Sequence, residues 1–139
     1  MQDNGRPAGA QTGGGFAGGC QCGAVRYRSS ANTAFSIQCY CRQCQRMTGS
    51  GYAPQVGLPR DSVTFVGQLQ RFEVVADSGQ PVELLFCGTC GTPIGKRPRR
   101  FPDRIFLLAG SLDDPSLYQP GNAVWRQSSQ NWDMLAEPY

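Results

Sequence analysis

The most regular feature of the chain is a series of short stretches in which apolar and polar side chains alternate. They lie within residues 25–28, 35–39, 62–65, 71–74 and 82–86. Such alternation is typical of strands that bury one face, because successive side chains of a strand point to opposite sides. The apolar run at 105–109 indicates a sixth strand, buried on both faces.

Turn-forming residues separate these predicted strands, at 59–61, 77–79, 97–98, 102–103 and 113–115. No window of about a dozen residues has a helical hydrophobic period. Several short strands at close spacing favour an all-β fold of antiparallel sheets, a sandwich or an open barrel, with few or no long helices.

The N-terminal stretch has a different composition from the rest of the chain. Residues 1–19 are mostly Gly, Ala, Gln and Asn, and we interpret residues 1–16 as a disordered, glycine-rich lead-in. Phe16 marks where order would begin. The length of 139 residues suits one domain with a real core, so residues 17–139 are predicted to form a single domain.

Apolar segments are too short for a membrane helix. The longest uninterrupted apolar run is residues 105–109, whereas a membrane helix needs about 20 apolar residues. The first residues lack the basic start and apolar stretch of a signal peptide. We therefore expect a non-secreted, cytoplasmic protein with no membrane partner.

The sequence contains no histidine but seven cysteines. The lack of histidine excludes Ser-His-Asp triads, Cys-His dyads, HExxH metalloproteases and His-Cys-Cys zinc deaminases. An odd number of cysteines would leave one thiol outside a pure disulfide framework. In a reducing compartment clustered cysteines usually bind metal, so the seven cysteines are the candidate functional residues of this chain.

Two of the three cysteine groups supply two sulfurs each. Cys87 and Cys90 form a knuckle with two residues between them, and Cys20 and Cys22 have one residue between them. A glycine follows each pair, and after the knuckle it lets backbone amides turn toward the sulfurs. Together the two pairs complete a tetrahedral four-thiolate site that clips the first strand to the middle of the chain.

The third group is Cys39, Cys41 and Cys44, whose spacing lets all three sulfurs point at one ion. The sulfur of Cys39 should face inward, because Phe35 and Ile37 share its strand face. Three ligands and an open fourth position are the arrangement of a catalytic zinc site. An iron–sulfur cluster, buried free thiols and a redox pair are the alternatives, although the spacings match neither common ferredoxin run.

A zinc ion on three thiolates carries one net negative charge. Such an ion should be a weaker Lewis acid than zinc on three neutral imidazoles, and less suited to making hydroxide from water. It is better suited to holding an added thiol as an electron-rich thiolate. The cysteine triple therefore favours thiol chemistry over hydrolysis.

The cysteine groups and the residues around them resemble a known family. The segments are GCQCGAVRY at 19–27, CYCRQC at 39–44, FCGTCGT at 86–92 and AGSLDDP at 109–115. From about residue 17 to residue 135 the chain is similar to the glutathione-dependent formaldehyde-activating enzyme family, which also includes centromere protein V. The resemblance implies a zinc-bearing β fold in which the sheets are arranged like a tent.

The same resemblance implies two Zn²⁺ ions per chain with different roles. The structural ion would lie on Cys20, Cys22, Cys87 and Cys90, and the catalytic ion on Cys39, Cys41 and Cys44. The implied activity is that of a carbon–sulfur lyase, the reversible condensation of formaldehyde with glutathione to S-hydroxymethylglutathione. Many members have histidine where this chain has Tyr40, and another near residues 122–125.

Other polar residues near these motifs have two interpretations. Arg42 and Arg46 flank the cysteine triple and are candidate substrate-binding residues, because an arginine can hold a glutathione carboxylate with two hydrogen bonds. The alternative is that they are ordinary surface charges. We interpret Asp113 and Asp114 as a turn or helix start rather than as acid–base groups.

Two further features are given structural interpretations. Trp125 and Trp132 are expected in the core or at its edge. The one basic cluster, residues 96–100 with Arg104, is interpreted as a solvated loop. The formal net charge of +3 falls to near zero once seven thiolates and two zinc ions are counted, so nucleic acid is not an expected partner.

Two functional hypotheses result. The first is a zinc-dependent enzyme acting on thiol–aldehyde adducts, with a small thiol such as glutathione as its partner. The second is a zinc-stabilised binding module whose second zinc site is inert. The additional cysteine triple favours the first, and the missing histidines favour the second.

Overall fold

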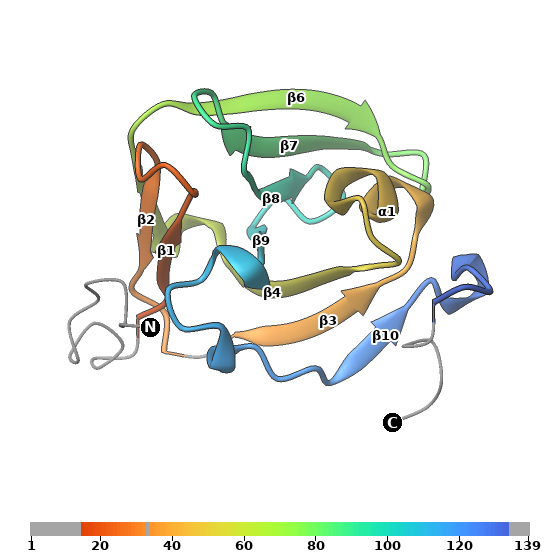
Figure 1. Cartoon of the computed structure of the whole chain (residues 1–139). Helices are drawn as coiled ribbons and strands as arrows, with labels where there is room; N and C mark the ends of the chain where they lie inside the picture. The colour runs from red at the N-terminus through yellow and green to blue at the C-terminus, as the bar shows by residue number, and fades with distance from the viewer. Residues whose placement is uncertain (1–14, 33, 134–139) are drawn as a thin grey trace.

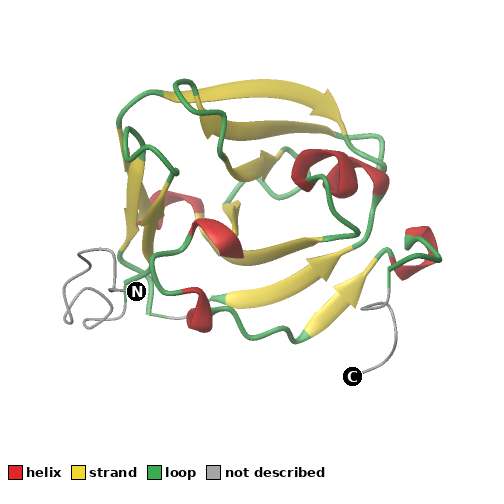
Figure 2. Cartoon of the chain, viewed as in Figure 1, coloured by secondary structure: helices red, strands yellow, loops and turns green. Residues whose placement is uncertain are grey.

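The computed structural model describes residues 15–32 and 34–133. Within these residues the chain forms ten short strands, one α-helix and several single turns of 3₁₀-helix (Figure 1, Figure 2). The strands form two sheets, one of three and one of seven strands. The prediction of an all-β protein without long helices is therefore confirmed. The predicted lead-in at residues 1–14 lies outside the described residues.

The smaller sheet is antiparallel, in the order β1-β2-β5. Its strands are β1 (Ala17–Gly19), β2 (Arg26–Ser29) and β5 (Val63–Val66). The predicted alternation in β2 is confirmed, because Tyr27 is buried between the exposed side chains of Arg26 and Arg28. The hydroxyl groups of Tyr27 and Ser111 are 2.7 Å apart, and this hydrogen bond joins the smaller sheet to the turn after β9.

The larger sheet has the order β10-β3-β4-β9-β8-β7-β6. In chain order its strands are β3 (Phe35–Cys39), β4 (Ala53–Pro59), β6 (Leu69–Val75), β7 (Pro81–Cys87), β8 (Pro93–Pro98), β9 (Arg104–Leu108) and β10 (Asn122–Val124). All neighbouring pairs are antiparallel except β10 and β3, which run parallel. A long connection after β9 carries the chain back to the start of β3, which makes the parallel pairing possible.

The sheets enclose the main apolar core. Figure 1 shows the larger sheet curving so that β6 and β7 lie opposite β3 and β4, with β1 and β2 at one end and α1 (Arg42–Thr48) at the other. Residues of both sheets meet inside, and Phe16 packs with them. The predicted strand at 105–109 is confirmed as β9, where Ile105 to Leu108 are all buried.

The helical turns are short and mark the ends of strands. They are α1 and the 3₁₀ turns Arg60–Ser62, Ala109–Ser111, Pro115–Leu117 and Arg126–Ser128. With seven residues, α1 is too short to produce a recognisable hydrophobic period. Its C-terminal cap is Gly49, whose φ of 71° lies in the left-handed region that favours glycine. No helix of the described residues is long and apolar enough to cross a membrane.

Several sequence expectations about individual strands are wrong. Residues 97–98 were expected in a turn and 96–100 in a solvated loop, but Lys96 to Pro98 belong to β8. The strand tolerates Pro98 because it is the last residue. An ion pair of 2.9 Å from Arg97 Nε to Glu83 Oε1 fastens this segment to β7.

Two aromatic side chains expected inside are on the surface. Phe72 belongs to the alternating stretch predicted at 71–74, but it is 63% exposed, because its side chain borders an open hollow beside Arg42 and Arg46. Trp132 is 62% exposed rather than at the core edge. In β7 an irregularity between Leu85 and Phe86 shifts the alternation, so Leu85 is buried against expectation.

Candidate metal centres

The first centre joins the two sheets at their turns. Cys20 follows β1, and Cys22 lies in the turn before β2. Cys87 is the last residue of β7, and Cys90 lies in the turn before β8. Their four sulfur atoms lie within 4.8 Å of one another. The two cysteine pairs thus meet as the sequence predicted.

Local backbone geometry turns amide groups toward these sulfurs. The N–H groups of Thr89 and Cys90 donate to Cys87 Sγ at 3.3 and 3.4 Å. The N–H of Val25 donates to Cys20 Sγ at 3.2 Å. Gly23 and Gly91 make the turns possible, with φ values of 85° and 79°. Amide donors of this kind stabilise thiolates, which is what metal ligation requires.

The distances in this centre fit a tetrahedral ion. Cys20 Sγ is 3.6 Å from Cys22 Sγ, and Cys22 Sγ is 3.8 Å from Cys87 Sγ. Zinc–sulfur bonds of about 2.3 Å place tetrahedral sulfurs about 3.8 Å apart. A disulfide would need about 2.0 Å. All seven cysteines lie in the described part of the chain and all are free, so the residues fit a metal centre and not a disulfide framework.

Thr92 supports the exposed side of the same centre. Its hydroxyl lies 3.0 Å from Cys90 Sγ and accepts the N–H of Gln21 at 3.1 Å. The Thr92 hydrogen bond is the largest cause that lowers the pKa of Cys90 to about 5. At neutral pH Cys90 is therefore ready as a thiolate ligand.

The second centre is buried at the end of β3. Cys39 is the last residue of β3, Cys41 is the N-cap of α1, and Cys44 lies in its first turn. Their sulfurs lie within 4.8 Å of one another, and the three residues are 5%, 4% and 0% exposed. The expectation that Cys39 faces inward is confirmed. They form a small second core with Ala53 and Leu108.

Donors from three elements point at these sulfurs. The N–H of Cys44 donates to Cys41 Sγ at 3.3 Å. Cys44 Sγ accepts from Gln55 Nε2 on β4 at 3.6 Å and from Lys96 Nζ on β8 at 3.2 Å. Hydrogen bonds from Cys39 and then Cys44 lower the pKa of Cys41, whereas hydrogen bonds with Cys41 and then Cys44 raise the pKa of Cys39. Although the hydrogen bond with Cys39 lowers the pKa of Cys44, Cys41 and burial leave it raised. Negative charge is therefore favoured on Cys41, and the three converging sulfurs fit one metal ion that would hold all of them as thiolates.

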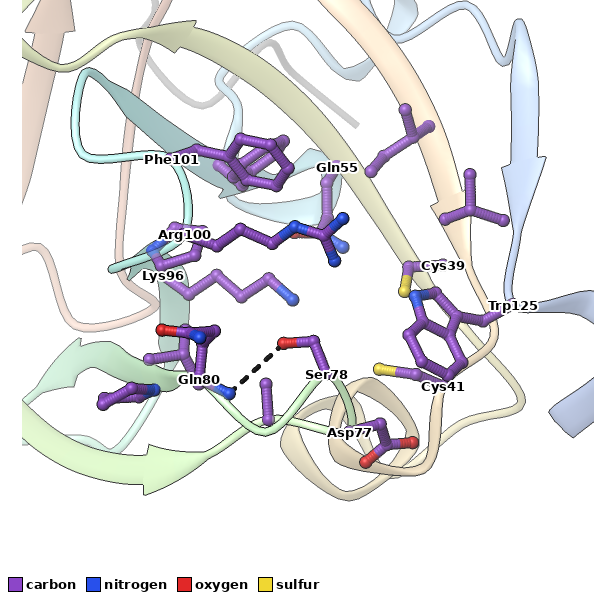
Figure 3. Close-up of a pocket in the computed structure, with 17 residues that line it drawn as sticks. Cys39, Cys41, Gln55, Asp77, Ser78, Gln80, Lys96, Arg100, Phe101 and Trp125 are labelled. Carbon is purple, nitrogen blue, oxygen red and sulfur yellow. Dashed lines mark hydrogen bonds between the residues drawn. The ribbon is translucent and has the colours of Figure 1, made fainter.

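A cavity of about 130 Å³ opens beside Cys39 and Cys41 (Figure 3). Lys96 crosses toward the cysteines from β8, and Arg100 reaches in from the turn after β8. The turn after β6 contributes Asp77 and, next to it, Ser78 and Gln80. The cavity thus places two cationic side chains beside two of the three sulfurs.

Trp125 closes the other side of this cavity. Parallel pairing sets Val124 opposite Cys39, so β10 delivers the indole next to the sulfurs (Figure 3). Trp125 is half-buried, as expected for a core-edge residue. Among the described non-glycine residues it is the only one with positive φ, 59°. Such backbone strain occurs most often at functional sites.

The arginines predicted to bind substrate do not reach the cavity. Arg42 and Arg46 are exposed on α1 and line a separate hollow with Phe72 and Val75. Asp77 borders both hollows and accepts the N–H of Arg42 at 3.0 Å. The two arginines therefore lie next to the candidate site but outside it.

The acidic pair has the structural role that the sequence indicated. Asp113 forms an ion pair with Arg26, with one contact of 2.9 Å to Asp113 Oδ1. Asp114 caps the turn Pro115–Leu117 by accepting the N–H of Ser116 at 3.1 Å. Neither aspartate lines the cavity beside the cysteines.

Sequence reasoning missed Lys96, Gln55 and Arg100. One signal was available for Lys96, because it is the only lysine of the chain. Gln55 gave no signal, since it lies in β4, a strand whose proline and glycine residues hide the alternation. Arg100 was counted as part of a solvated loop, although it borders the cavity.

The motifs and both centres agree with one protein family. The family model described as "Glutathione-dependent formaldehyde-activating enzyme" matches residues 15–128. The chain belongs to this family.

Two individual proteins show the same likeness. A Halomonas elongata protein named "Putative glutathione-dependent formaldehyde-activating enzyme" is 28% identical over 101 residues. That match covers 69% of this chain and 64% of the relative, which is less than two thirds of its length. A Rhodobacter sphaeroides protein of known crystal structure has a TM-score of 0.59 at 20% identity, covering 78% of this chain and 99% of its own. The latter likeness shows the fold alone.

The two positions at which many family members have histidine differ in their surroundings here. Tyr40 is fully buried and packs on Tyr52, with ring centres 5.1 Å apart, and it does not line the cavity. Residues 122–125 contribute Val124 and Trp125 to the cavity wall. Only the second of these departures therefore changes a residue that faces the cavity.

Proposed function

We propose that this protein is a zinc-dependent enzyme of the carbon–sulfur lyase type that acts on thiol–aldehyde adducts. The substrate pair is glutathione and formaldehyde, and the product is S-hydroxymethylglutathione. One observation carries the proposal. Three buried cysteine sulfurs converge beside a cavity, while a separate four-cysteine cluster already supplies a complete structural centre.

The two centres have different roles in this proposal because they have different numbers of ligands. Four thiolates complete a tetrahedral shell, so the cluster of Cys20, Cys22, Cys87 and Cys90 stabilises the fold. Cys39, Cys41 and Cys44 would hold the second ion with one position open. When bound there, zinc supplies a site that keeps an added thiol deprotonated and nucleophilic.

The reaction needs neither an oxidant nor a reductant. The glutathione sulfur forms a bond to the aldehyde carbon, the carbonyl double bond becomes a single bond, and the thiol proton ends on the new hydroxyl group. In the cavity beside Cys39 and Cys41 this step would take place against the apolar side chains of Trp125 and Phe106, which are part of its lining.

Gln55 is placed to hold the hydroxymethyl group. Its side chain lines the cavity and is 1% exposed, and its Oε1 atom has no hydrogen-bond partner among the described residues. A buried acceptor without a partner is costly unless a ligand satisfies it. The hydroxyl group of the adduct is such a ligand.

A substrate as long as glutathione extends beyond the cavity. Arg42 and Arg46 are proposed to meet its outer carboxylates, since their hollow lies next to the cavity and Asp77 borders both. All seven cysteines are free, which suits the reducing cytoplasm in which we place the protein.

The test is the rate at which glutathione and ¹³C-formaldehyde interconvert with their adduct, measured by NMR exchange above the spontaneous rate. Zinc-loaded wild-type protein should accelerate the exchange, and Cys41→Ser protein should not. An Arg28→Met variant, which changes an exposed residue of the smaller sheet, is the matched control and should keep the acceleration. Absence of acceleration by wild-type protein with both metals bound would contradict the proposal.

The lack of histidine favours the second candidate, a binding module with an inert second centre. In that case the protein would bind two metal ions without accelerating the exchange. The same NMR measurement therefore separates the two functions.

A further inference from the structure

Lysine occurs once in this chain, at position 96, whereas the other twelve Lys or Arg positions are arginine. Lys96 lies on β8, and its side chain is directed toward the cysteine triple (Figure 3). The Nζ atom is 3.2 Å from Cys44 Sγ and 3.5 Å from Gln43 Oε1. The ammonium group of the chain's only lysine thus contacts a predicted metal ligand.

The charge of the triple explains why a cation is needed at this place. Three thiolates exceed the charge of a divalent ion by one, and an added thiolate would make the excess two. Burying an uncompensated charge is strongly unfavourable, and Cys44 is fully buried. Lys96 offsets one charge, and Arg100 at the cavity wall can offset the second.

The shape of the lysine head group agrees with this role. A compact ammonium fits this enclosed position better than the planar fork of an arginine, which suits carboxylates.

In the described part of the chain, no lysine or arginine donates a hydrogen bond to a sulfur of the four-cysteine cluster. Its sulfurs receive hydrogen bonds from backbone amides and from Thr92, and Cys22 and Cys90 are exposed to solvent. Water screens the charge of such a site. A fixed cation is needed where all the sulfurs are buried, whereas in the four-cysteine cluster Cys87 is the one buried member.

We propose that Lys96 is a positioning residue that balances the charge of the cysteine triple, through its hydrogen bond to Cys44, so that the site holds a metal ion and admits an anionic sulfur ligand. The ligand class is a small thiol bound as thiolate, whose proton passes to the buffer. This inference rests on the second metal ion of the proposed function but not on its aldehyde or on catalysis.

The first test measures metal affinity. Cobalt is loaded into the second centre, and its affinity is measured by competition with a chromophoric chelator. Lys96→Met should weaken binding about 10- to 100-fold, as loss of a partner behind a metal ligand usually does. Lys96→Arg should keep part of the affinity. Arg99→Met removes the same charge from an exposed side chain three positions away and should change nothing.

A second test adds 2-mercaptoethanol at equal cobalt occupancy of the wild-type and Lys96→Met proteins. The thiolate charge-transfer band should rise in both, with an apparent Kd at least about tenfold weaker in Lys96→Met. The inference would be overturned if Lys96→Met bound both cobalt and the thiol as tightly as the wild-type protein does. Suppose that Lys96→Met binds cobalt and thiol more weakly, but wild-type protein does not accelerate aldehyde exchange. This result would contradict the proposed function and leave the inference standing.

A third test keeps the inference falsifiable should Lys96→Met fail to fold. The wild-type chain is acetylated at its amines, with and without the second metal ion, and the labelled peptides are quantified by mass spectrometry. If the bound metal fixes Cys44 and with it the hydrogen bond that holds the Lys96 ammonium, acetylation of Lys96 should be slower in the metal-loaded protein, with the N-terminal amine as the internal control. Equal Lys96 rates in the two states would overturn the inference.

Discussion

The two cysteine clusters use the same ligand atom in opposite surroundings. The four-cysteine cluster lies in two surface turns, and backbone amides supply most of the hydrogen bonds to its sulfurs. The cysteine triple lies at a buried strand end, and side chains from β4 and β8 donate to Cys44 Sγ beside a single backbone donor to Cys41 Sγ. The first depends on local turn geometry, and the second depends on how distant strands pair.

In the proposed function, this difference separates a structural centre from a reactive one. A site completed by four protein ligands near solvent has its charge screened and has no room for a substrate. A three-ligand site beside a cavity must compensate its charge within the protein, and the same compensation makes room for another anion. The predictions below test this division, beginning with the largest effect.

The cysteines of the two centres should differ most in their effect on folding. Cys87→Ser should unfold or aggregate the protein, because a structural zinc ion contributes on the order of 10 kcal/mol to folding. Cys41→Ser should remove only the second ion and keep the β-type circular dichroism. Circular dichroism with elemental analysis of both variants checks this. Equal loss of folding in the two variants would make the second centre structural.

Gln55 should matter for the reaction but little for stability. Gln55→Leu removes a buried amide whose Oε1 has no partner among the described residues and whose Nε2 donates one hydrogen bond, to Cys44 Sγ, so the free energy of unfolding should fall by only about 1 kcal/mol. Exchange catalysed with formaldehyde should fall roughly tenfold, because the hydroxyl of the adduct loses its acceptor. Gln38→Leu, which changes another buried glutamine outside the cavity lining, is the control for exchange. A stability loss of several kcal/mol for Gln55→Leu would show that its amide is structural instead.

The fluorescence of Trp125 should respond mainly to metal binding at the second centre. In a Trp132→Phe variant the remaining indole lies beside Cys39 and Cys41. Cobalt in the triple should quench its fluorescence strongly, whereas cobalt in the four-cysteine cluster should quench it less. A stepwise metal titration shows both events. Equal quenching by the two ions would mean that Trp125 does not cover the triple.

The smallest effect concerns Tyr27, in the sheet that carries Cys20. Burial raises the pKa of Tyr27, so its contribution to stability is complete below its ordinary pKa of about 10 and is lost as pH rises above that value. Tyr27→Phe should cost about 1 kcal/mol at pH 8 by removing the hydrogen bond to Ser111. Its stability should then fall less steeply between about pH 9 and 11 than that of the wild type, as urea unfolding would show. Parallel pH profiles would contradict the buried-phenol interpretation.

Much of the cysteine chemistry was predictable because it is local. Pairs with one or two intervening residues and a following glycine bring sulfurs and amides together within one turn, wherever the turn lies in the fold. The strands with strict alternation, such as β2, were predictable for the same reason. One tetrahedral ion takes four ligands, and this alone predicted that two cysteine pairs would converge. The pairs are Cys20 with Cys22 and Cys87 with Cys90.

The sequence by itself determined which residues could bind metal, whereas the tertiary structure decided what surrounds them. Lys96 reaches Cys44 only because β8 lies between β7 and β9 in a curved sheet, and Trp125 reaches the triple only through the parallel pairing of β10 with β3. Arg42 and Arg46, although adjacent in sequence to the triple, point from α1 into another hollow. Neighbours along a chain share a turn, but the charge and shape of a buried site depend on strands that only the packed core brings together.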